Sequence, residues 1–104
     1  MARKQNLVSL GEINIPVPNI GTPVANVSTL TKSVLIQSKT TNSDLIYILD
    51  SNGNVAHSLE PGNSVEINGD NLDNGTGGYL DLREIFLDAE VNGSKAIACY
   101  LDNQ

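Results

Sequence analysis

Few residues of this chain could take part in catalysis, and they do not form a known catalytic pattern. His57 is the only histidine and Cys99 the only cysteine among 104 residues. A nucleophilic triad needs a serine or cysteine, a base and an orienting acid, and the sequence has no G-x-S-x-G nucleophile elbow. His57 stands in an alternating stretch, and Cys99 has no basic neighbour closer in sequence than Lys95. We therefore expect an ordinary strand histidine and a packed thiol.

Acidic and amide side chains gather in a turn-rich segment and could bind calcium. Their oxygen atoms are the ligands that this hard cation prefers. The spacing does not fit the register of an EF-hand loop, so we expect a solvated turn and no metal site. The residues are Asp70, Asn71, Asp73, Asn74 and Asp81.

Two glutamates, Glu66 and Glu90, could form the carboxylate pair of a glycosidase if they met across strands. Glycosidases line their clefts with aromatic side chains, but this chain has one phenylalanine, three tyrosines and no tryptophan. The sequence therefore predicts a protein that is not an enzyme and that needs no cofactor.

The charge balance argues against nucleic acid and anionic membranes as partners. The formal net charge is −6, and the six basic residues are scattered along the chain instead of clustered. A single cysteine excludes an internal disulfide framework. No apolar signal-peptide core follows Arg3 and Lys4, and no apolar stretch approaches the ~18 residues of a membrane span. We expect a protein made in a reducing cytoplasm.

From residue 32 onward, short apolar or alternating segments are separated by strong turn signals. Turns are predicted at Asn52-Gly53, Pro61-Gly62 and Asn92-Gly93. Residues 79–84 are expected to form a turn or one short helical turn, and residues 68–78 a loop. The predicted strands cover residues 33–38, 45–49, 55–59, 64–67, 85–91 and 96–101. The last of these places Ala96, Ala98 and Tyr100 on one face and Ile97, Cys99 and Leu101 on the other.

This pattern predicts an all-β fold. With a strand in the N-terminal region it gives about six or seven strands, as an antiparallel β-sandwich or a small jelly-roll-like barrel. The division that we expect is an extended N-terminal arm at residues 1–30 and a β-sandwich domain at residues 31–104.

The N-terminal 30 residues combine prolines with many apolar side chains. Pro16, Pro18 and Pro23 exclude a helix, whereas the apolar content is too high for a segment that stays solvated. Two interpretations remain open: a first strand of the domain's own sheet, or an arm laid across a neighbouring subunit. In the second interpretation the residues that contact the partner are Leu7, Val8, Leu10, Ile13, Ile15, Val17, Ile20 and Val24.

Residues 33–101 resemble small β-sandwich proteins of tailed-phage virions, especially capsid decoration (cement) proteins. The resemblance is carried by residues 33–36, 45–48, 59–67 and 85–93, which read SVLI, LIYI, LEPGNSVEI and IFLDAEVNG. It implies binding at junctions between capsid subunits, often as trimers, with arms that reach neighbouring subunits. It supplies no catalytic motif.

The leading hypothesis is therefore a virion structural protein that is displayed on the capsid surface and reinforces the phage head. Its partners would be the major capsid protein or other virion proteins, together with further copies of itself, as a trimer by preference. One alternative is a carbohydrate-binding or host-recognition module, for which only Tyr47, Tyr79 and Tyr100 could provide a sugar platform. Another is a tail or neck component.

Overall fold

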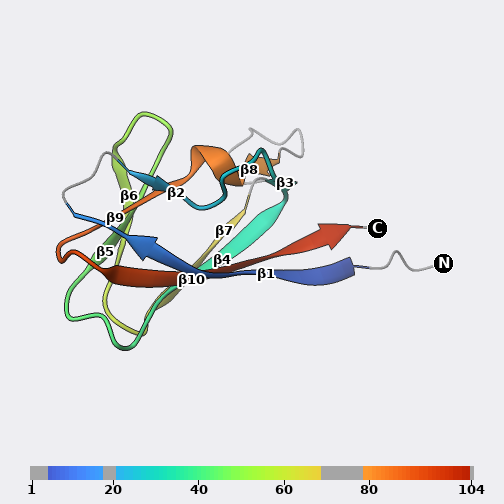
Figure 1. Cartoon of the computed structure of the whole chain (residues 1–104). Helices are drawn as coiled ribbons and strands as arrows, with labels where there is room; N and C mark the ends of the chain where they lie inside the picture. The colour runs from blue at the N-terminus through green and yellow to red at the C-terminus, as the bar shows by residue number, and fades with distance from the viewer. Residues whose placement is uncertain (1–4, 18–20, 69–78, 104) are drawn as a thin grey trace.

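The computed structural model describes residues 5–17, 21–68 and 79–103. Their fold is all-β and antiparallel, with two four-stranded sheets packed face to face (Figure 1). Sheet A contains, in spatial order, β1 (Gln5–Ile15), β10 (Ser94–Asn103), β4 (Ser33–Ser38) and β7 (Ser64–Asn68). Sheet B contains β2 (Thr22–Pro23), β9 (Phe86–Ala89), β5 (Ile46–Leu49) and β6 (Val55–Leu59). The predicted sandwich is thus confirmed.

In the part of the chain that the structure describes, three smaller elements, two strands and one helical turn, belong to neither four-stranded sheet. β3 (Leu30–Thr31) pairs with β8 (Leu80–Asp81), and a 3₁₀ helix, η2 (Leu82–Glu84), follows β8. The helical turn agrees with the prediction for residues 79–84 over its second half, whereas residues 80–81 form a short strand that was not predicted. No helix in the described ranges is long and apolar enough to cross a membrane.

The strand order is that of a jelly roll. Counted along the chain without β3 and β8, the strands of sheet A have the order 1-8-3-6 and those of sheet B the order 2-7-4-5. Each strand of sheet A therefore faces a strand that precedes or follows it in the other sheet, as two nested Greek keys require. Of the two predicted forms, the structure has the sandwich with jelly-roll connections.

The core follows the alternation of the strands. Val34 and Ile36 of β4 and Ala96 and Ala98 of β10 point inward from sheet A and are fully buried. Sheet B contributes side chains from β5 and β9, among them Ile46, Ile48 and Leu87. The small alanines of β10 leave room for these larger aliphatic groups, so the core is filled almost without aromatic residues.

The structure does not divide the chain at residue 30 as the sequence predicted. β1 pairs with β10 from Gln5↔Asn103 to Ile15↔Ser94, and β2 pairs with β9. Ile15 and Val24 belong to the buried core. The physical reason is that β10 would otherwise be an edge strand with half of its backbone groups unpaired, and β1 has the alternating side chains needed to pair with it.

The prediction for the strand over residues 85–91 was too long. β9 ends at Ala89, because the turn to β10 already begins with Glu90. This turn is held by the side-chain oxygen of Asn92, which accepts a hydrogen bond from the backbone N–H of Val17 at 2.9 Å. The turn therefore also fixes the end of the segment that follows β1.

Candidate functional site

The structure separates the residues that could have acted together in catalysis. His57 is exposed on β6, an edge strand of sheet B, whereas Cys99 is half-buried on β10 in sheet A. Glu66 belongs to β7 of sheet A, and Glu90 follows β9 of sheet B. Neither a cysteine–histidine pair nor the considered glutamate pair is formed.

The candidate calcium ligands are largely outside the described residues. Asp70, Asn71, Asp73 and Asn74 fall in that part of the chain. Asp81 is described, and both of its carboxylate oxygens accept hydrogen bonds from within the protein. Among residues 5–17, 21–68 and 79–103, no three acidic, histidine or cysteine side chains gather in a way that could hold a metal ion.

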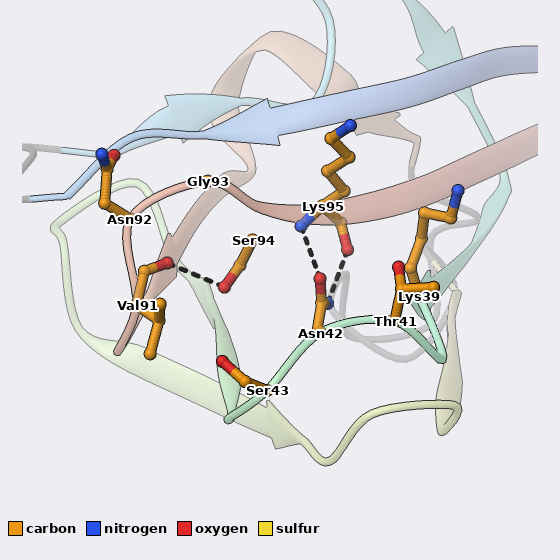
Figure 2. Close-up of a pocket in the computed structure, with 9 residues that line it drawn as sticks. All are labelled: Lys39, Thr41, Asn42, Ser43, Val91, Asn92, Gly93, Ser94 and Lys95. Carbon is orange, nitrogen blue, oxygen red and sulfur yellow. Dashed lines mark hydrogen bonds between the residues drawn. The ribbon is translucent and has the colours of Figure 1, made fainter.

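A polar pocket of about 250 Å³ lies where the β4–β5 loop meets the β9–β10 turn. Figure 2 shows that Asn42 lies between the two segments: its side-chain N–H donates to the carbonyl of Lys95 at 2.7 Å, and its oxygen accepts from the N–H of Lys95 at 2.8 Å. Ser94 donates to the carbonyl of Val91 at 2.8 Å. These polar groups bond one another, so they form a structural joint between two loops.

The two lysines at this pocket extend away from Ser94 and Val91 (Figure 2). Lys39 donates a hydrogen bond to Glu12 of β1, and the Lys95 ammonium lies 3.7 Å from the other oxygen of the same carboxylate. Hydrogen bonding to Lys39, followed by its positive charge, lowers the pKa of Glu12. Because both ammonium groups face this carboxylate, the pocket offers no preformed site for an anion.

A larger groove, of about 540 Å³, opens between β1 and residues 22–29. It marks the side of the sandwich where β1 and β2 are the edge strands. Its lining includes Leu10, Ile13, Val24, Val27 and Tyr100, of which Val27 is 68% exposed. Polar residues such as Glu12 and Asn14 also line the groove, so it is only partly apolar.

The outer face of sheet A carries an apolar cluster that we call the outer patch: Leu7, Leu35, Cys99 and Leu101. Leu7 is opposite Leu101 in the β1–β10 pair, and Cys99 is opposite Leu35 in the β10–β4 pair. Leu7 is 70% exposed, Leu35 43% and Leu101 40%. The patch surrounds a shallow, mainly apolar hollow of about 210 Å³ that also touches Ser33, Glu66 and Tyr100. It is the most coherent candidate site in the described structure.

The eight residues that were predicted to contact a partner differ in how far they are exposed in the structure. Leu7 is exposed in the outer patch, Ile15 and Val24 are core residues, and Ile20 lies outside the described residues. The remaining four are half-buried: Val8, Leu10, Ile13 and Val17. The buried pair cannot meet a partner, because both side chains pack inside the sandwich.

Leu35 and Leu101 were not predicted as site residues from the sequence, and Cys99 was considered only as a possible catalytic thiol. The alternation of β10 had already placed Cys99 and Leu101 on the face opposite Ala96 and Ala98, and the structure confirms this. The sequence therefore contained a signal for the outer patch. Both faces of this strand carry apolar side chains, so either both faces are buried or one of them is an exposed apolar surface.

The three tyrosines lie on different surfaces. Tyr47 projects from the outer face of sheet B and donates a hydrogen bond to Glu90, which is the main reason that its pKa is raised. Tyr100 is half-buried at the core side of sheet A. Tyr79 is exposed beside Lys32, whose ammonium lies 5.6 Å from the ring centre. They do not form a stacking platform for a sugar.

Comparison of the chain with protein-family models and with curated proteins finds no match.

Proposed function

We propose that this protein is a structural component of a virion that binds other proteins through the outer patch, as an auxiliary decoration protein of a phage head. The observation that carries the proposal is the outer patch itself. Three leucines and a half-buried cysteine lie together on a sheet face that no other part of the described chain covers. Contiguous exposed apolar surface of this kind marks protein interaction sites.

The size of the patch fits weak, repeated binding. The outer patch consists of four side chains, whereas a standard protein interface takes about 20–30 residues from each partner. One such contact gives low affinity, whereas many copies on a symmetric shell hold together through multivalency. A decoration protein needs this kind of contact.

The fold and the sequence resemblance support the same function. Jelly-roll sandwiches are common in viral capsid proteins, although lectins and other proteins use them too. The segments that resemble phage decoration proteins include Leu35 and span β4, β5, β7 and β9. The proposed partners are the major capsid protein and further copies of this chain, and the proposed location is the capsid surface.

The test is co-sedimentation of the purified protein with phage heads that lack it. Leu35→Lys places a charge in the outer patch, and we expect it to weaken binding more than about tenfold, because a desolvated ammonium costs binding energy. Val55→Lys is the matched control: Val55 is also exposed, but it lies on β6 of the other sheet.

Equal binding of Leu35→Lys and the native protein would overturn the role of the patch. Binding to isolated tails in preference to heads would overturn the head assignment and favour the tail or neck alternative.

A further inference from the structure

Among the strands that the structure describes, β1 is the longest at a sheet edge. Among the described strands it pairs with β10 alone. The backbone N–H and C=O groups of alternate residues point away from β10 and therefore have no strand partner. The other edge strands are shorter or interrupted: β6 and β7 have five residues each, and β2 has two and contains Pro23. Natural sheets shorten or block their edges to prevent pairing with other chains. Residues 5–9 of β1 contain no proline and no charged side chain, so this part of the edge is not blocked in these ways.

The first half of β1 also projects beyond the body of the sandwich. β4 pairs with β10 only as far as Tyr100↔Val34, so residues 5–7 of β1 and 101–103 of β10 continue as a two-stranded ribbon (Figure 1). On the β4 side, the carbonyl of Leu101 already accepts a hydrogen bond from the Thr31 hydroxyl at 3.1 Å. Within residues 5–17, 21–68 and 79–103, the edge of the ribbon that has no strand partner is therefore the β1 side, which we call the free edge. Two-stranded ribbons are marginally stable alone and gain stability from a third strand.

The outer patch reaches this free edge. Its most exposed member, Leu7, is the outermost apolar residue on the β1 side, whereas toward β7 the patch ends at Glu66, the partner of Leu35. The patch is thus apolar at one margin of the sheet and charged at the other. A strand that paired with β1 would cover the Leu7 side chain if it had an apolar residue directly opposite Leu7.

We propose that two copies of this chain pair through residues 5–9 of β1, antiparallel and around a two-fold axis at Leu7. The pairing joins the two A sheets into one continuous sheet. It places Leu7 of one copy beside Leu7 of the other, with Leu101 next to each, so that four leucines form one row. The β-bulge between Ser9 and Gly11 limits the paired stretch to its N-terminal side.

A second copy fits this edge better than a peptide of another protein. Pairing of two β1 strands satisfies both free edges at once, whereas a bound peptide leaves its own outer edge unpaired. The chain has a net charge of −6, so two copies repel each other in most relative orientations. Residues 5–9 (Gln, Asn, Leu, Val, Ser) contain no charged side chain, so the proposed pairing brings no like charges together.

The first experiment is the mass of the isolated protein by light scattering over a dilution series. We expect a dimer that Leu7→Lys weakens at least about tenfold, because two ammonium groups then lie opposite each other on paired strands. Two controls should dimerise like the native protein: Leu35→Lys, in the same patch but away from the edge, and Val27→Lys, equally exposed but at the groove. A native monomer, a native trimer, or a Leu7→Lys variant that dimerises normally would overturn the proposal.

The second experiment is disulfide trapping in a Cys99→Ser background. With Leu7→Cys, the two-fold axis brings the two thiols within bonding distance, and mild oxidation should give a covalent dimer. Leu35→Cys is the matched control and should remain monomeric under denaturing conditions. Equal cross-linking of both variants would contradict the edge pairing.

These outcomes are separate from the virion proposal, because they concern the purified protein without particles. Leu35→Lys should lose particle binding and keep the dimer. If Leu35→Lys still binds particles like the native protein, the virion proposal fails, whereas a monomeric native protein or a Leu7→Lys variant that dimerises normally shows that the edge pairing fails.

Discussion

Asp81 connects two segments that are far apart in sequence. Its carboxylate accepts hydrogen bonds from the Ser28 hydroxyl at 2.8 Å, the Thr29 N–H at 3.0 Å and the Arg83 N–H at 3.1 Å. The bond from Ser28 is the main reason that the pKa of Asp81 is lowered. One residue thus caps η2 and holds the segment before β3 against it.

The lowered pKa predicts a pH-dependent contribution of Asp81 to stability. Because the folded pKa is below the ordinary value of 3.8, the contribution is complete well above that value and is lost as pH falls through the folded pKa. Asp81→Asn should therefore be less stable than the native protein at neutral pH, and the difference should shrink as pH falls below 3.8. Urea denaturation across this range measures it. A difference that does not change with pH would contradict the prediction.

Gly21 is required where the chain enters β2. Its φ is +108°, and a Cβ at this position would lie 3.1 Å from the Cβ of Phe86. We expect Gly21→Ala to lower the free energy of unfolding by about 1–3 kcal/mol through backbone strain and crowding. Gly53→Ala is the control with strain alone, since its φ is +85° but no atom lies within 4 Å of the added Cβ. Equal losses in denaturant titrations would show that the contact with Phe86 does not matter.

At the scale of elements, Asn42 joins the β4–β5 loop to the start of β10. Its side chain bonds both the N–H and the carbonyl of Lys95, as a neighbouring strand would, and also donates to the Ser38 hydroxyl at 2.9 Å. Asn42→Ala should reduce the free energy of unfolding by about 1–3 kcal/mol, because these partners lose their bonds. Thr41→Ala, at the next position in the same loop, should have little effect. Denaturant titration of both variants compares them, and similar stabilities would contradict this role.

At the scale of the whole molecule, our proposal gives two neighbouring residues of β4 different roles, one in folding and one in binding. Ile36 is fully buried between the sheets, and Leu35 is exposed in the outer patch. Ile36→Ala should cost about 2–5 kcal/mol of stability through loss of buried contacts and the cavity that remains. Leu35→Ala should change stability by less than about 1 kcal/mol and yet weaken binding to phage heads. Denaturation together with co-sedimentation tests both, and a large loss of stability in Leu35→Ala would contradict the assignment.

Local sequence features predicted most of the secondary structure. Alternation and β-branched residues located β4, β5, β6, β7 and β10 closely, and the turns at Asn52-Gly53 and Asn92-Gly93 lie where the strands end. Such features act within a few residues, because side-chain alternation and a positive φ at glycine are properties of the local backbone. The sequence by itself thus determined where most strands from residue 33 onward lie and how their side chains alternate, whereas the short strands β2, β3 and β8 were not predicted.

Only the tertiary structure decided which strands are neighbours. Leu7 lies opposite Leu101, although they are at the two ends of the chain, and the same pairing draws Ile15 into the core. The apolar residues before residue 30 gave no local signal that could distinguish a strand of the chain's own sheet from an arm, because both are extended and apolar. The outer patch is likewise a product of pairing between β1, β10 and β4. A surface that is built from segments distant in sequence forms only when the strands pair.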